Sequence, residues 1–198
     1  MTQKDFATLA QGIVVRRAEL EEIESVWELA EASATAARWS RAAFTPYVGA
    51  VGDSGALQAK AMFVAWANAS GGAAEPVGED APTVPMRRII GFAAFSCIMT
   101  VGAGESTLEN MVVATRWQRQ GVGRRLLADG LLWCRAHAAR AAFLEVRTSN
   151  RAAIALYERA GFSVVGNRPG YYRDPVEDGL QMQKSLDAPP VEAGNSPC

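Results

Sequence analysis

The fold of this chain is decided by the run Arg116-Trp117-Gln118-Arg119-Gln120-Gly121-Val122-Gly123-Arg124-Arg125. A strand-like run, residues 107–113, precedes it, and apolar residues at helical spacing follow it. This order predicts a strand, a tight Gly-x-Gly turn and the start of a helix. A helix start carries unpaired N–H groups and a partial positive charge, and glycines let the backbone approach an anion closely. The turn is therefore a candidate pyrophosphate site.

Two common nucleotide-binding motifs do not fit this turn. The Gly-x-x-x-x-Gly-Lys-Ser/Thr phosphate loop does not occur in the sequence. A Gly-x-Gly-x-x-Gly dinucleotide motif would need glycine where Leu126 stands. The remaining pattern, Gln118-x-x-Gly121-x-Gly123, is similar to the acetyl-CoA signature of the GNAT superfamily. The plainer alternative is a glycine-rich strand–helix turn with solvated arginines.

A second informative segment lies downstream. Residues 141–148 have the pattern of a strand, and Ser149-Asn150 can cap a helix over 151–160. Gly161 stands where a left-handed residue ends such a helix, and the next strand follows from position 162. Glu145 lies in mid-strand among apolar neighbours, which is a costly place for a carboxylate.

The predicted helix over 151–160 has one face directed at the turn. Asn150, Ile154 and Tyr157 are spaced i, i+4 and i+7 and therefore share that face. We expect Tyr157 to look toward the turn while Leu156 packs elsewhere.

The run from Leu144 to Phe162 resembles the signature of the RimI-type ribosomal-protein alanine N-acetyltransferases. Tyr171-Tyr172 and the later Glu177-Asp178-Gly179-Leu180-Gln181-Met182 are similar to the end of that family's sequences. Trp39-Ser40, with Phe44 four residues after Ser40, resembles its N-terminal element. The resemblance extends from about Leu108 to Met182 and fades before Ile89.

The resemblance implies an α/β GNAT fold. This fold is a mixed, twisted central sheet flanked by helices, with a V-shaped splay between the fourth and fifth strands. It also implies acetyl transfer from acetyl-CoA, as co-substrate and without a metal, to the N-terminal amine of a protein, with a ribosomal protein as the expected acceptor. Since a fold hosts many acceptors, two alternatives stay open. One is an acetyltransferase for a small amine or a lysine side chain, and the other is a non-catalytic acyl-CoA-binding module.

The resemblance gives Glu145 the role of general base, and burial beside Phe143 and Leu144 would raise its pKa. An α-amine is already roughly a tenth neutral at pH 7, so the base has modest work. The alternative is a carboxylate tied to Arg147 or another arginine. Tyr157 would donate a proton to the departing CoA thiolate. The alternative for Tyr157 is a core tyrosine with a hydrogen-bonded hydroxyl.

The remaining site residues are also carried over from the family. Main-chain groups in the strand would hold the acetyl-pantetheine arm, and the turn would hold the pyrophosphate. These residues are Met111, Val112, Val113, Arg119, Gln120, Gly121, Val122, Gly123 and Arg124. Asn150 would contact the pantetheine arm, although capping alone explains it. Tyr171 and Tyr172 would line the acceptor side, or would form an aromatic pair over the core.

The chain has 198 residues, which suits one domain with a substantial core. We expect this domain to span 12–186, with a mobile loop at 67–86 and a disordered tail at 187–198. Expected strands cover 13–16, 61–66 and 89–98, and a helix covers 20–34, with a second short helix after Ser40. The helix after the turn would bury Val122, Leu126, Leu127, Leu131, Cys134 and Ala138.

Composition narrows the possible partners. The formal net charge is −1 and the arginines are local, so nucleic-acid binding is not supported. No apolar run approaches 18 residues, and the first eleven residues lack the apolar segment of a signal peptide. Cys97 and Cys134 lie in apolar elements without metal-ligand spacing, so we expect buried thiols and a cytoplasmic location. The oligomeric state is left open.

Overall fold

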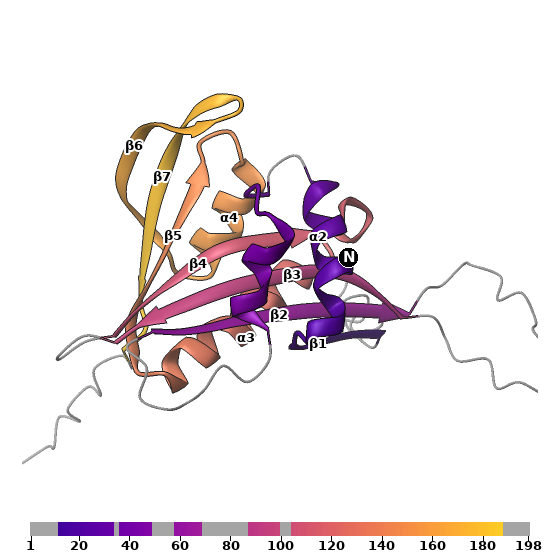
Figure 1. Ribbon diagram of the computed structural model, residues 1–198. Helices are drawn as coiled ribbons and strands as arrows, with labels where there is room; N and C mark the ends of the chain where they lie inside the picture. The colour runs from indigo at the N-terminus through magenta and orange to yellow at the C-terminus, as the bar shows by residue number, and fades with distance from the viewer. Residues whose placement is uncertain (1–11, 34–35, 49–57, 69–86, 100–103, 188–198) are drawn as a thin grey trace, which may run out of the picture.

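The computed structural model describes residues 12–33, 36–48, 58–68, 87–99 and 104–187. Its seven strands form one sheet with the order β1-β2-β3-β4-β5-β7-β6 (Figure 1). The strands are β1 Ile13–Arg17, β2 Gln58–Asn68, β3 Arg87–Ile98, β4 Gly104–Val113, β5 Ala139–Arg147, β6 Ser163–Arg173 and β7 Val176–Ser185. All neighbouring strands are antiparallel except β4 and β5, which are parallel. The expected mixed α/β sheet is confirmed.

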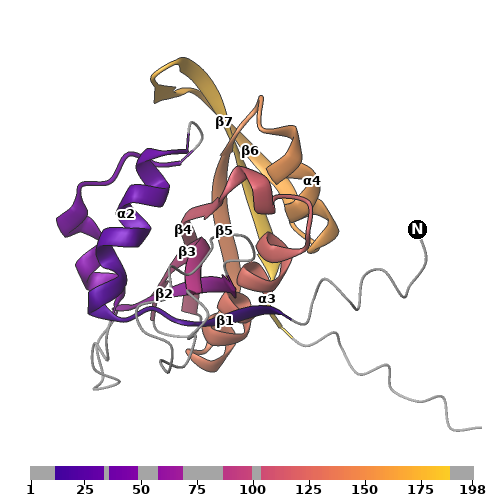
Figure 2. The ribbon, with the colours of Figure 1, turned by 90° about the vertical axis from the view of Figure 1, so that its right-hand side faces the viewer.

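Helices cover both faces of the sheet. They are η2 Leu20–Glu22, α2 Ile23–Glu31, η3 Arg41–Tyr47, η4 Thr115–Trp117, α3 Val122–Ala136 and α4 Arg151–Arg159. Figure 2 shows α2 on one side of the sheet and α3 and α4 on the other. Each side has its own core. The larger core packs α3 and α4 against the sheet, and the smaller one packs α2 and η3 against β2 and β3.

The parallel pair β4–β5 opens into a V. Its pairing runs from Gly104 opposite Ala139 to Leu108 opposite Leu144 and then ends. Beyond that point β4 continues to pair with β3, and β5 continues to pair with β7. Figure 1 shows the two strands diverging from a common end. The edges of β4 and β5 that face each other therefore keep unpaired main-chain groups, as the expected splay between the fourth and fifth strands requires.

Three local expectations are wrong in detail. The expected loop at 67–86 begins two residues too early, because Ala67 and Asn68 pair with Arg88 and Arg87 in β2–β3. Ala138 is not on the buried face of α3, since it follows the helix, is exposed and adopts a left-handed φ of 57°. The first helix is shorter than 20–34, because a 3-10 turn replaces its start and α2 ends at Glu31.

Some expectations concern residues outside the described ranges. Ala34, the rest of the loop (69–86) and the tail from 188 onward belong to this group.

Cys97 and Cys134 are both buried and free. In the part of the chain that the structure describes, no helix is long and apolar enough to cross a membrane. The same residues include no group of three or more side chains that could hold a metal ion.

Candidate active site

The predicted strand–turn–helix unit is present at the open end of the V. Gly121 has a φ of 83°, a left-handed conformation that strains any residue with a Cβ, and α3 begins at Val122. The first α-helical hydrogen bond runs from the Arg125 N–H to the Gly121 carbonyl, 3.1 Å away. The N–H groups of the helical residues before Arg125 have no partner within the helix. The turn thus offers a row of main-chain donors at the positive end of a helix.

Glutamine side chains hold the approach to this turn. The Gln118 amide donates to the Val113 carbonyl at 3.1 Å, and the Gln120 amide donates to the Arg116 carbonyl at 2.7 Å. The Gln120 side chain therefore supports the loop through this hydrogen bond. Arg119 adopts a left-handed φ of 61°, which is uncommon for a residue with a side chain.

The side chain of α4 that lies against the turn is Leu156, whereas Tyr157 was expected there. A Cβ placed on Gly123 would lie 3.2 Å from Leu156 Cδ2, so Leu156 packs directly against the glycine. The expectation that Leu156 packs elsewhere is wrong. Glycine at position 123 is explained by this close approach of α4 to the start of α3.

Glu145 lies on β5 directly after the last residue paired with β4. Leu144 and Val146 on either side belong to the core under α3 and α4, so Glu145 faces the opposite, α2 side. Its Oε1 accepts a hydrogen bond from Arg168 Nη1 at 2.8 Å, and the side chain is 23% exposed. The strand neighbours of Glu145 are apolar as expected, and a guanidinium from β6 compensates the carboxylate, as in the alternative of a carboxylate tied to an arginine.

Tyr157 lies on the other side of the sheet, in the core formed by α3 and α4. Its ring meets Phe162 edge-on with centroids 6.0 Å apart. Burial, and secondarily the neighbouring Tyr172, raises the pKa of Tyr157 above its ordinary value, so the phenol keeps its proton at physiological pH. Among the described residues its hydroxyl has no hydrogen-bond partner, which differs from the alternative of a hydrogen-bonded core tyrosine.

Asn150 caps α4 as expected. Its Oδ1 accepts a hydrogen bond from the Ala153 N–H at 3.2 Å. At the other end of the helix Gly161 has a φ of 89°, the left-handed conformation predicted for that position. The cap fixes the direction in which α4 leaves β5, and it therefore places Tyr157.

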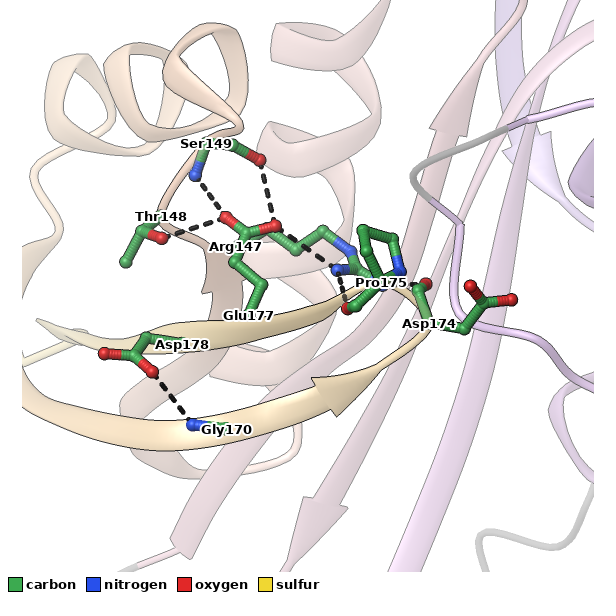
Figure 3. A network of polar contacts seen from close by, with 8 residues as sticks. All are labelled: Arg147, Thr148, Ser149, Gly170, Asp174, Pro175, Glu177 and Asp178. Carbon is green, nitrogen blue, oxygen red and sulfur yellow. Dashed lines mark hydrogen bonds and ion pairs between the residues drawn. The ribbon is translucent and has the colours of Figure 1, made fainter.

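A polar network ties the β6–β7 hairpin to the end of β5 (Figure 3). The Glu177 carboxylate accepts hydrogen bonds from the Ser149 N–H at 2.6 Å, the Thr148 hydroxyl at 2.9 Å and the Ser149 hydroxyl at 3.1 Å. Arg147 donates to the same carboxylate at 3.3 Å. These donors lower the pKa of Glu177 to about 2, the Ser149 N–H contributing most. We call Arg147, Thr148, Ser149 and Glu177 the hairpin latch.

The latch also orders the hairpin turn. Arg147 donates to the Asp174 carbonyl at 2.7 Å and to the Pro175 carbonyl at 3.1 Å (Figure 3). Its guanidinium lies 4.2 Å from the centroid of the Tyr172 ring, within the range of a cation–π contact. Arg147 thus joins the end of β5 to the β6–β7 turn and to Tyr172, one of the two expected acceptor-side tyrosines.

Tyr171 and Tyr172 are brought to the Glu145 side of the site by these arginines. Their rings are perpendicular with centroids 5.0 Å apart, and Tyr171 is 43% exposed. Arg168, which binds Glu145, also lies 4.8 Å from the centroid of the Tyr171 ring. The exposed Tyr171 and the half-buried Tyr172 therefore lie beside the carboxylate and are not part of the core.

The sequence did not reveal Arg168 or the contacts of Glu177. Arg168 is 23 residues from Glu145, and Glu177 is 30 residues from Arg147. No local pattern links residues at such separations. The alternative interpretation ties Glu145 to Arg147 or another arginine, and Arg168 is that other arginine.

A family model agrees with this architecture. Residues 79–162 match the model described as the acetyltransferase (GNAT) family. The chain is 36% identical over 101 residues to N-alpha-acetyltransferase RimI of Mycobacterium tuberculosis, which covers 51% of this chain and 62% of the relative. It is 45% identical over 89 residues to the ribosomal protein bS18-alanine N-acetyltransferase of Escherichia coli, covering 45% of this chain and 58% of that protein. Each match spans less than two thirds of the relative's length.

Solved structures share the fold over most of the chain. The crystal structure of the ribosomal-protein-S18-alanine N-acetyltransferase from Escherichia coli has a TM-score of 0.62 and 24% identity, covering 91% of this chain and 97% of that one. The NAA60 structure from Arabidopsis thaliana in complex with acetyl-CoA has a TM-score of 0.70 and 15% identity, covering 89% and 99%. At these identities the likeness establishes the fold.

Proposed function

We propose that this chain, whose residues 79–162 match the acetyltransferase (GNAT) family model, is an acetyl-CoA-dependent N-α-acetyltransferase that acts on a protein N-terminus. The observation that carries the proposal is the V between β4 and β5, which leads from the main-chain donors at the start of α3 to Glu145. A ligand that crosses the sheet through this V can bind on one side and meet an acceptor on the other.

The turn fits the pyrophosphate of acetyl-CoA. Its donors are main-chain N–H groups at the start of α3, and the nearby arginines add positive charge. The residues proposed to hold this group are Arg119, Gln120, Gly121, Val122, Gly123 and Arg124. Gln120 would contribute through its main chain, because its amide is bound to the Arg116 carbonyl.

The open edge of β4 fits the extended arm of the same molecule. Met111, Val112 and Val113 pair with β3 on one side, and no strand pairs with their other edge, where the Gln118 amide donates to the Val113 carbonyl. An amide-containing chain can complete such an edge as an added strand would. We assign Asn150 a supporting contact, since the amide nitrogen is left over when its oxygen caps α4. When bound, acetyl-CoA supplies the acetyl thioester.

Glu145 and Tyr157 have complementary proton roles in this proposal. Glu145 faces the acceptor side and would accept the proton of the amine, directly or through a water. Tyr157 is on the α3–α4 side, and its protonated hydroxyl has no hydrogen-bond partner among the described residues, so it would supply a proton to the leaving thiolate. The two groups are on opposite sides of the sheet, so each can serve a different partner of the reaction.

The proposed acceptor is a protein N-terminus, with a ribosomal protein as the first candidate. Support comes from the aromatic pair of Tyr171 and Tyr172 beside Glu145 and from the activity named for the Escherichia coli relative. Such an acceptor would be met in the cytoplasm.

The test is mass spectrometry of peptides incubated with the protein and acetyl-CoA. The panel contains peptides with free Ala, Ser and Met N-termini and one N-blocked peptide with an internal lysine. Acetylation of free N-termini alone is the expected result. Acetylation of the blocked peptide would move the acceptor to lysine. Modification of none of the peptides would contradict the proposal and favour a small amine or a non-catalytic module.

A further inference from the structure

A second carboxylate lies across the V from Glu145. The pairing between β4 and β5 ends at Leu108 and Leu144, and the residues that follow are Glu109 on β4 and Glu145 on β5. Both leucines belong to the core under α3 and α4. Side chains alternate along a strand, so both glutamates face the α2 side of the sheet. The apex of the V, where the two strands begin to separate, is therefore flanked by one carboxylate on each strand.

A β-bulge sets the position of Glu109. The register of β3 and β4 shifts between Ala94 and Phe95, which pair with Asn110 and Leu108, so Glu109 has no cross-strand partner. Leu108 and Asn110 are 6% and 5% exposed, whereas Glu109 between them is exposed. A bulge commonly redirects a side chain beside a functional site.

The contacts of Glu109 confirm the face on which it lies. Its Oε1 accepts a hydrogen bond from the Ser96 hydroxyl at 2.6 Å. Ser96 faces the α2 side, because Phe95 and Cys97 belong to the opposite core. Tyr47 of η3 is near enough that burial, together with the Glu109 charge, raises its pKa to about 12.

The two carboxylates differ in their charge compensation. Glu145 is paired with Arg168 at 2.8 Å. Within the described ranges, no lysine or arginine nitrogen lies within 4.0 Å of the Glu109 carboxylate, and the Lys60 ammonium lies instead 4.9 Å from the centroid of the Tyr47 ring. Glu109 is thus an exposed negative charge at the apex of the V with no ion-pair partner among the described residues.

We propose that Glu109 binds the protonated amine of the acceptor at the apex of the V, beside Glu145. The inference rests on the proposed function, because only an acetyltransferase reaction of that kind brings an acceptor amine to this side of the sheet. An α-ammonium is the predominant form at pH 7 and is complementary to an uncompensated carboxylate. Glu109 is then the group that selects a charged amine, while the base remains Glu145.

The test is the binding of two peptides that differ only in the amine. One has a free alanine N-terminus, and the other has a propionyl group there, so that a hydrogen replaces the amine. Both are titrated by calorimetry into the protein saturated with CoA, which has no acetyl group to transfer. We expect the wild-type protein to bind the amine peptide about tenfold more tightly, as a charge-assisted hydrogen bond allows.

Glu109→Gln should remove most of this preference, because it weakens the binding of the amine peptide and leaves the binding of the propionyl peptide unchanged. Glu105→Gln is the matched control. Glu105 is also an exposed glutamate on β4, but it lies in the paired part of the strand opposite Ala141. This control should keep the wild-type preference.

A Glu109→Gln protein that keeps the full preference overturns the inference. Glu109→Asp retains the charge and should retain part of the preference, which separates loss of charge from loss of structure. The peptide panel above identifies the other kind of failure. If the wild-type protein acetylates free N-termini but Glu109→Gln keeps the preference, the inference alone is wrong. If it acetylates none of them, the proposed function is wrong.

Discussion

Gly130 allows α3 to pack directly on the sheet, and replacing it with alanine should destabilise the protein. A Cβ at this position would lie 2.0 Å from Phe95 Cε2 and 2.3 Å from Phe95 Cζ. Carbon atoms in contact are ordinarily about 3.5–4.0 Å apart. Phe95 is 1% exposed in the middle of β3, so its ring has no free space to enter. Either α3 lifts by roughly 1.5 Å or the ring leaves its rotamer.

Two opposing effects set the size of the change. Overpacking a core costs about 1–3 kcal/mol, and the overlap with the Phe95 ring places Gly130→Ala at the upper end. Alanine gains about 1 kcal/mol over glycine in a helix interior. The free energy of unfolding should therefore fall by about 2 kcal/mol. For a chain of this size that lowers the thermal midpoint by about 4–8 °C.

Urea unfolding followed by circular dichroism measures this difference. The matched control is Ala128→Gly, because Ala128 is exposed on the same helix and reports helix propensity alone. This control should cost about 1 kcal/mol. A Gly130→Ala protein that is as stable as the wild type, or more stable, would refute the packing argument. In that case helix propensity, and not the contact with Phe95, would decide the outcome at this position.

Three further predictions concern the site. Glu145→Gln should lower kcat by about 10²–10⁴-fold. The Kd for acetyl-CoA should not change, because Glu145 faces the side of the sheet opposite α3, where the proposed pyrophosphate turn lies. An unchanged kcat would remove Glu145 from the reaction. Tyr157→Phe should also lower kcat while changing the free energy of unfolding by less than about 0.5 kcal/mol, since no hydrogen bond within the described residues is lost. Steady-state kinetics and urea unfolding measure the two quantities. An unchanged kcat with a lowered free energy of unfolding would make Tyr157 a structural residue. Glu177 has a pKa lowered from 4.5 to about 2, so its stabilisation is present above pH 4.5 and is lost as the pH falls through about 2. Wild type should therefore exceed Glu177→Gln in thermal midpoint at pH 7 and converge with it near pH 2, and a difference that persists at pH 2 would contradict the latch.

The local architecture of the site follows from short-range sequence patterns. The left-handed Gly121, the start of α3, the Asn150 cap and the left-handed Gly161 all depend on residues within a few positions. Helix and strand periodicity and capping chemistry act over that range, so a single sequence contains the information. The mixed sheet and the V between β4 and β5 were also expected, but from the family resemblance and not from periodicity.

The errors in prediction occur where a local pattern competes with a longer-range contact. Ala67 and Asn68 follow a turn-like composition, yet their pairing with β3 extends the strand. Leu156 was expected to pack away from the turn, but α4 approaches α3 so closely that Leu156 contacts Gly123. Ala138 continues the apolar spacing of α3, although the helix has already ended.

The sequence by itself determined which segments become strands and helices and where the turn and caps form. Tertiary structure alone decided which charges meet: Arg168 with Glu145, Arg147 with Glu177, and no described cation with Glu109. These partners depend on the register of β6–β7 against β5 and on the bulge in β4. Register is set by the packing of whole strands, so charge compensation at the site exists only once the sheet has formed.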